Sequence, residues 1–195
     1  MIQDLDLHRE RLLELGANKT AHLDGDLLAH FGNVSRNLQE MSRPDYVVLA
    51  GLYHGSYGTH ALHGEDTFEL DAAQRERISA YIGEPAERLV YLFSVMTYES
   101  LGRSVRNMLK PGGKPALWNR CSDEALPATE EEFHDVLWIK LADILAHLPH
   151  FTREERREAM TTYGPFWRFV AEYLGADKTP GWPAVSERAM LDAEL

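Results

Sequence analysis

Two histidines, His30 and His54, are placed by the sequence pattern where they could share a metal ion. His30 follows Leu27 by three residues and precedes Val34 by four, so helical spacing puts it on the apolar face of a predicted helix. His54 ends an apolar run that begins at Val47. A buried neutral imidazole needs partners for both nitrogens, and a metal ion can supply one of them. We therefore predict a shared metal site; the alternative is that each histidine is bonded to protein groups in the core.

A carboxylate is expected beside these histidines, because two neutral imidazoles alone hold a divalent ion weakly in competition with water. Asp143 lies on a mostly apolar predicted helix, where its spacing places it at the margin of the buried face. His30, His54 and Asp143 are thus the predicted metal ligands. The alternative is a boundary carboxylate paired with Lys140 or Arg120.

Four further histidines extend the set of candidate ligands. His147 follows Asp143 by four residues and shares its helix face, which makes it either a further ligand or a residue that supports one. His22, His60 and His63 flank the two predicted histidine ligands in sequence and are candidates to complete the coordination.

One His–Asp pair is predicted to be coincidental. His134 and Asp135 are adjacent near the start of their predicted helix, and His134 points about half a turn away from Asp143. We expect neither residue to belong to the metal site.

The segment after His54 supplies residues for catalysis and substrate binding. Tyr57 and His60 are the predicted catalytic residues, since a phenol or an imidazole can transfer a proton. Ser56 is a predicted substrate-binding residue, and Arg103 is another, suited to an anionic substrate. The alternatives are exposed loop residues and, for Arg103, a surface ion pair.

Apolar periodicity and capping residues predict an all-α helical bundle of six to eight helices in one domain spanning 1–195. Capping boxes begin at Thr129 and Thr152, and Gly175 ends the last helix. Irregular segments are predicted near 55–70 and 108–128, and no alternating pattern indicates a strand. The predicted helices cover 5–15, 27–41, 44–54, 71–83, 85–96, 129–148, 152–163 and 166–174.

The order of His30, Leu49–His54 and Leu141–Asp143 resembles the HD-domain superfamily, in which a His, a His–Asp doublet and a later Asp lie on a helical bundle. With Tyr57–Thr59 and Gly83–Leu89, it is also similar to an uncharacterised HD-like family in which a small residue replaces the Asp of the doublet. Most HD-domain enzymes are phosphohydrolases, and a minority are diiron oxygenases.

Gly55 stands where the HD pattern has the doublet Asp, which usually bridges two metals or holds the water nucleophile. We therefore expect one metal, not two. Two imidazoles and one carboxylate match the ligand set of non-haem Fe(II), and would also hold Mn(II), Zn(II) or Ni(II). The favoured function is iron- and oxygen-dependent oxidation of a small molecule. The alternatives are an HD-type phosphohydrolase of a nucleotide or small phosphoester, and a metal-free HD-like binding scaffold.

The charge and composition of the chain argue for a small-molecule substrate. The formal net charge of −11 would repel nucleic-acid phosphates and anionic lipid, so we expect neither partner. The single cysteine, Cys121, and the absence of a signal-like N-terminus favour the cytoplasm. The aromatic segment Tyr163–Trp167 is a candidate to cover the pocket or to form a homodimer surface.

Overall fold

The computed structural model describes residues 4–16, 27–57, 72–182 and 184–186, and it confirms the all-α fold class. None of the helices in these ranges combines the length and apolar composition needed to cross a bilayer. The elements are α1 (Leu5–Glu14), α2 (Leu27–Glu40), α3 (Asp45–Tyr53), α4 (Ala72–Ile82), α5 (Glu84–Val95), α6 (Tyr98–Met108), β1 (Leu117–Asn119), β2 (Glu124–Leu126), α7 (Glu130–His147), the 3-10 turn η1 (Leu148–His150), α8 (Arg153–Thr162), α9 (Gly164–Leu174) and the 3-10 turn η2 (Ala176–Lys178).

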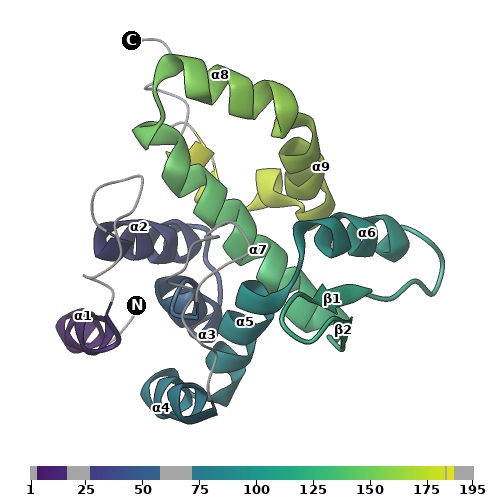
Figure 1. Ribbon diagram of the computed structural model, residues 1–195. Helices are drawn as coiled ribbons and strands as arrows, with labels where there is room; N and C mark the ends of the chain where they lie inside the picture. Colours follow the sequence, from purple (N-terminus) through teal and green to yellow (C-terminus); the bar gives the residue numbers. More distant parts are fainter. Residues whose placement is uncertain (1–3, 17–26, 58–71, 183, 187–195) are drawn as a thin grey trace.

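Helix α7 crosses the middle of the molecule, and α2, α3 and α5 pack against it (Figure 1). Its start is fixed by the predicted capping box, in which Thr129 accepts from the backbone N–H of Glu132 and the Glu132 side chain accepts from that of Thr129. Pro149 lies in η1, directly after the end of the helix. Side chains from successive turns of this long central helix therefore reach the middle of the bundle.

Helices α2 and α3 approach each other closely because a glycine lies at their contact. A Cβ atom built on Gly51 of α3 would collide with Cδ1 of Leu38 on α2. Val34 and Leu38 are fully buried on the same face of α2. This close packing brings the inward face of α2 next to the C-terminal end of α3.

Two local elements differ from the sequence prediction. The nine α-helices named above are more than the six to eight expected, because α6 was not recognised. Its N-cap is Thr97, whose hydroxyl accepts from the N–H of Ser100, but apolar residues are sparse along it. The segment predicted to be irregular near 108–128 contains the antiparallel pair β1–β2, whose three-residue strands are too short to show an alternating pattern.

A buried carboxylate ties α5 to the segment that follows α3. Glu87 on α5 accepts a hydrogen bond of 2.9 Å from the Tyr57 hydroxyl. It also accepts two from the Arg75 guanidinium on α4, at 2.7 and 2.8 Å. This bidentate pair links three parts of the bundle through one side chain.

We expect Glu87→Gln to lower the free energy of unfolding by about 2 kcal/mol, because it leaves the Arg75 charge without its carboxylate in a largely buried place. We place the loss below that of a fully buried pair, since the Arg75 side chain is 34% exposed. Urea unfolding would measure it. The matched control is Glu84→Gln in the first turn of the same helix, where the exposed side chain should change stability by less than about 0.5 kcal/mol. Equal stability of the two variants would contradict the assigned role of Glu87.

Candidate metal centre

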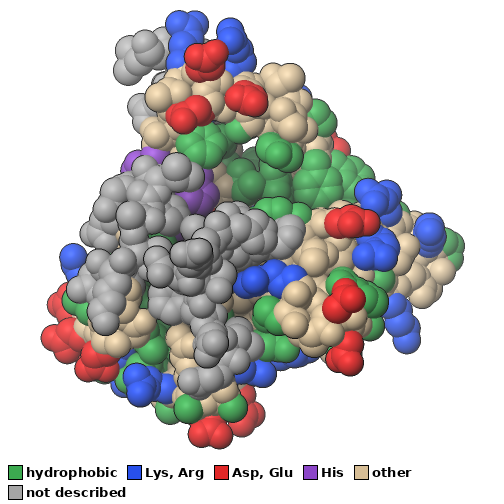
Figure 2. Space-filling model, viewed as in Figure 1, with side chains coloured by type: hydrophobic (Ala, Val, Ile, Leu, Met, Phe, Trp, Pro, Cys, Tyr) green, Lys and Arg blue, Asp and Glu red, His purple; other side chains and the backbone are tan. Residues whose placement is uncertain are grey.

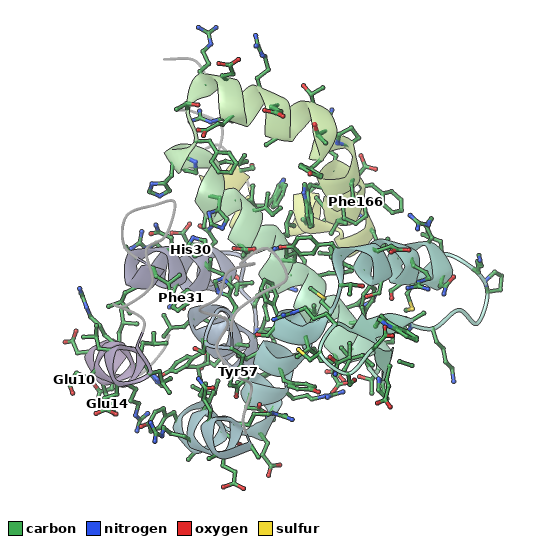
Figure 3. The ribbon with its side chains drawn as sticks, in the orientation of Figure 1. Glu10, Glu14, His30, Phe31, Tyr57 and Phe166 are labelled. Atoms are coloured by element: carbon green, nitrogen blue, oxygen red, sulfur yellow. The ribbon has the colours of Figure 1, made fainter. Side chains whose placement is uncertain are left out.

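The structure brings His30, His54 and Asp143 together from three helical segments. His30 comes from α2, His54 directly follows α3, and Asp143 comes from the middle of α7. The ligand atoms of these three buried residues all lie within 4.8 Å of one another. Nε2 of His30 is 3.1 Å from Oδ1 of Asp143, and Nε2 of His54 is 3.5 Å from the same oxygen. Figure 3 labels His30 on α2, beside α7. This group could hold a metal ion.

The orientation of His54 is set by its own helix. Its Nδ1 lies 2.7 Å from the carbonyl oxygen of Gly51, an acceptor only, so Nδ1 carries a hydrogen. When Nδ1 carries the only ring hydrogen, Nε2 presents a lone pair toward the carboxylate oxygen of Asp143. Two lone pairs that face each other at 3.5 Å repel unless a cation lies between them. The backbone of α3 thus leaves Nε2 as the His54 atom that could bind a metal.

Asp143 uses its two oxygens for different partners. Lys140, one turn earlier on α7, donates to Oδ2 at 2.7 Å, while the histidines lie around Oδ1. Burial alone would raise the pKa of Asp143, but the Lys140 ammonium, with hydrogen bonds from His147 and His30, holds it well below its usual range. The carboxylate is therefore ionised, and its ion pair with Lys140 leaves Oδ1 available to a metal.

Lys140 is held as a buried cation. Besides Asp143, it donates to the Tyr98 hydroxyl at 3.0 Å and lies 5.0 Å from the centre of the Phe93 ring. Burial alone would lower its pKa, but the charge of Asp143 and the contact with Tyr98 raise it. The predicted alternative of an Asp143–Lys140 pair is thus present together with the histidine cluster. Arg120 instead donates to the carbonyl oxygen of Ser94 at 2.9 Å.

The position of Asp143 corrects the sequence analysis in one respect. The sequence pattern placed it at the margin of the buried face, but the residue is 4% exposed. The difference arises because α7 is covered on several sides, by α2, α3, α5 and α9. A central helix of this kind has no polar margin beside its apolar face.

Burial also keeps His30 in the protonation state that a ligand needs. Desolvation lowers its pKa to about 4, although the hydrogen bond with Asp143 opposes that shift. At neutral pH the ring is therefore uncharged, as a metal ligand must be. Its Nε2 can bind a metal in the tautomer that carries the ring hydrogen on Nδ1.

The distances in the cluster match those of a metal coordination shell. With metal–ligand bonds of about 2.1 Å, neighbouring ligand atoms lie about 3.0 Å apart at a right angle and about 3.4 Å apart at a tetrahedral angle. The two separations of 3.1 and 3.5 Å agree with these values. One ion could contact all three residues with only small side-chain movement.

His147 lies at the edge of the same cluster. Its Nε2 is 3.2 Å from Oδ1 of Asp143, and its ring stacks on that of His30 with centroids 4.1 Å apart. The side chain is 21% exposed, in contrast to the buried His30 and His54. Histidine side chains also reach the molecular surface just below α8 (Figure 2). The sequence left open whether His147 is a ligand or a supporting residue, and the structure places it against the Asp143 carboxylate.

The predicted catalytic and substrate-binding residues are not tested by this geometry. The buried Tyr57 hydroxyl donates to Glu87, and burial together with this carboxylate raises its pKa. The Ser56 hydroxyl is buried and has no hydrogen-bond partner among the described residues. Arg103 is exposed on α6. His60, like His22 and His63, lies outside the described residues.

The pair predicted to be coincidental forms other contacts. His134 lies 2.8 Å from the Tyr173 hydroxyl, and Asp135 accepts a 2.6 Å hydrogen bond from the Tyr46 hydroxyl. Cys121 is an exposed free thiol on the β1–β2 connection. In the sequence analysis, a Lys140–Asp143 ion pair was only an alternative to the metal site. The three-residue spacing on one helix was the available signal that the ion pair and the histidine cluster could share Asp143.

Comparison with known proteins assigns no activity to this arrangement. A family described as a domain of unknown function (DUF6817) matches residues 11–97, a segment that includes His30 and His54 but ends before Asp143. No curated protein and no solved structure shows a significant match to the chain.

Proposed function

We propose that the protein is an enzyme that acts on a small molecule at a single divalent metal ion held by His30, His54 and Asp143. The observation that carries the proposal is the hydrogen bond from Nδ1 of His54 to Gly51, which turns a lone pair toward an ionised carboxylate. A cation between these groups removes their repulsion. The separations between ligand atoms support the same assignment.

The surroundings of Gly55 support one metal rather than two. Position 55 has no side chain to offer, and a Cβ atom built there would lie 2.7 Å from Cε1 and Cζ of Phe31. The Phe31 ring therefore occupies the space next to His54 that a second carboxylate would need. Its centroid lies 5.0 Å from that of His54.

We favour Fe(II) as the metal and oxygen-dependent oxidation as the reaction. Two imidazoles and one carboxylate are the protein ligands of non-haem iron oxygenases, in which the iron supplies binding positions for oxygen and substrate. In this chain His30 and His54 supply neutral nitrogens, and Asp143 supplies one negative charge. Lys140 holds the far oxygen of Asp143, so the carboxylate is oriented to bind through Oδ1.

Hydrolysis of a small phosphoester is the second candidate function. The order of His30, His54 and Asp143 resembles the HD-domain pattern, and we propose a relationship to that superfamily. Mn(II) or Zn(II) in the same site would activate a bound water. The third candidate is a metal-free scaffold, which the Lys140–Asp143 ion pair would favour because it already compensates the carboxylate charge.

The reaction classes can be separated with nitric oxide and a phosphoester panel. We expect anaerobic Fe(II)-loaded protein to bind nitric oxide, an oxygen surrogate, and to give the electron paramagnetic resonance signal of a high-spin iron–nitrosyl complex. His54→Ala should lose both the iron and the signal. Turnover of phosphoesters with Mn(II), Mg(II) or Zn(II), independent of oxygen and abolished by His54→Ala, would reverse the ranking. Purified protein that neither contains nor takes up metal would leave only the scaffold.

A further inference from the structure

We propose that His147 is a fourth protein ligand, so that the centre consists of three imidazoles and one carboxylate. The proposal rests on the proposed metal site and adds a residue to it. His147 is outside the set of three whose ligand atoms all lie within 4.8 Å of one another. Its Nε2 is nevertheless 3.2 Å from Oδ1 of Asp143, between the corresponding distances of His30 and His54.

Three Nε2 atoms lie around one carboxylate oxygen, at separations that neighbouring ligands of one ion would have. His30, His54 and His147 approach Oδ1 from α2, from the end of α3 and from the last turn of α7. A separation of 3.2 Å lies between the values of about 3.0 and 3.4 Å expected for neighbouring ligands of one ion. The Nε2 atom of His147 is therefore already at a distance from Oδ1 that suits a second ligand of the same ion.

The position of the His147 ring is fixed by neighbours on both sides. It stacks on His30 at an interplanar angle of 22°, and on Phe151 at 12° with centroids 6.3 Å apart. The buried Arg156 of α8 donates to the carbonyl oxygens of Leu148 and Phe151, both at 2.9 Å, and so holds the chain directly after His147. This ordered setting is unlike that of a solvent-exposed histidine on a free helix end.

A fourth ligand from this position would compensate for Gly55. The site gains a ligand on α7 where position 55 offers none. Because His147 is the more exposed of the three histidines, it would be the ligand nearest to solvent. In a six-coordinate ion, four protein ligands leave two positions for small molecules.

Counting bound imidazoles tests the proposal without an activity assay. The protein is loaded with one equivalent of Cu(II), and electron spin-echo envelope modulation counts the coordinated imidazoles through their remote nitrogens. We expect three in the unmodified protein and two in His147→Ala, with a metal affinity at least about tenfold lower, since even loss of a residue that supports a ligand costs about that much. His147→Gln, which keeps more of the side-chain volume, should also give two.

The control is His150→Ala, which removes an exposed histidine three residues further along and should leave the count at three. A count of two in the unmodified protein would overturn the fourth ligand and leave the three-residue site intact. An unchanged count in His147→Ala with weaker binding would overturn it as well, because His147 would then only support Asp143. Failure of the unmodified protein to bind any metal would overturn both this proposal and the proposed function.

Discussion

Asp143→Ala is expected to leave the protein without bound metal and to lower its free energy of unfolding by about 3–5 kcal/mol. The metal is lost because the substitution removes the only carboxylate in the described cluster. Stability is lost because Lys140, 5% exposed, keeps a buried charge whose strongest partner has gone. Elemental analysis after dialysis measures the first effect, and urea unfolding of the metal-free protein measures the second.

The matched control is Asp135→Ala on the same helix. Asp135 is also hydrogen-bonded, to Tyr46, so its removal costs about 1–2 kcal/mol of stability but should leave the metal content unchanged. A second variant, Asp143→Ala with Lys140→Met, removes both charges and should recover part of the stability but none of the metal. Equal metal loss in Asp143→Ala and Asp135→Ala would show that a different carboxylate is the ligand.

Helical periodicity, together with the resemblance to the HD pattern, grouped the three proposed ligands in the sequence analysis. His30 lies at a position of α2 that shares a face with Leu27 and Val34, and all three are buried. His54 follows an apolar run that is buried along its length except at Leu49, which is partly buried. In a helical bundle, the inward faces of neighbouring helices pack around the same core. The sequence therefore predicted the cluster, although it could not supply its distances.

Other features of the centre depend on contacts between residues far apart in the chain. Nothing in the sequence near Lys140 shows that Tyr98 and Phe93 surround its ammonium. The contact between Phe31 and the backbone at Gly55 likewise depends on how closely α2 and α3 pack. Periodicity assigns a residue to a face, whereas these partners follow from the angle and separation of two helices.

Helix α6 was missed for a different reason. Its apolar positions, Leu101 and Val105, are buried on one face, but most of the remaining residues are polar or small. The stabilising contacts come from its N-cap and from packing against β1, neither of which changes the local hydrophobic pattern. A local signal was nevertheless present, since Leu101 and Val105 lie four residues apart on one face after the N-cap residue Thr97.

Gly55→Asp, which restores the acidic residue of the HD pattern, is expected to destabilise the protein without creating a second metal site. The new Cβ would lie 2.7 Å from two atoms of the buried Phe31 ring, closer than side-chain carbons approach in folded proteins. Overpacking of this kind costs about 1–3 kcal/mol. Burial of an additional carboxylate adds to that cost. Urea unfolding measures the stability, and elemental analysis should still give no more than one metal per chain.

Two companion variants separate this steric effect from a general intolerance of glycine substitution. Gly32→Ala in α2 should leave stability unchanged or raise it by up to about 1 kcal/mol, because its Cβ would meet nothing within 4 Å and Ala favours helix over Gly. Phe31→Leu combined with Gly55→Asp should destabilise less than the sum of the two single changes, since the smaller side chain makes room for the carboxylate. If Gly55→Asp alone were as stable as the unmodified protein and bound two metals, Phe31 would not be what limits the centre to one ion.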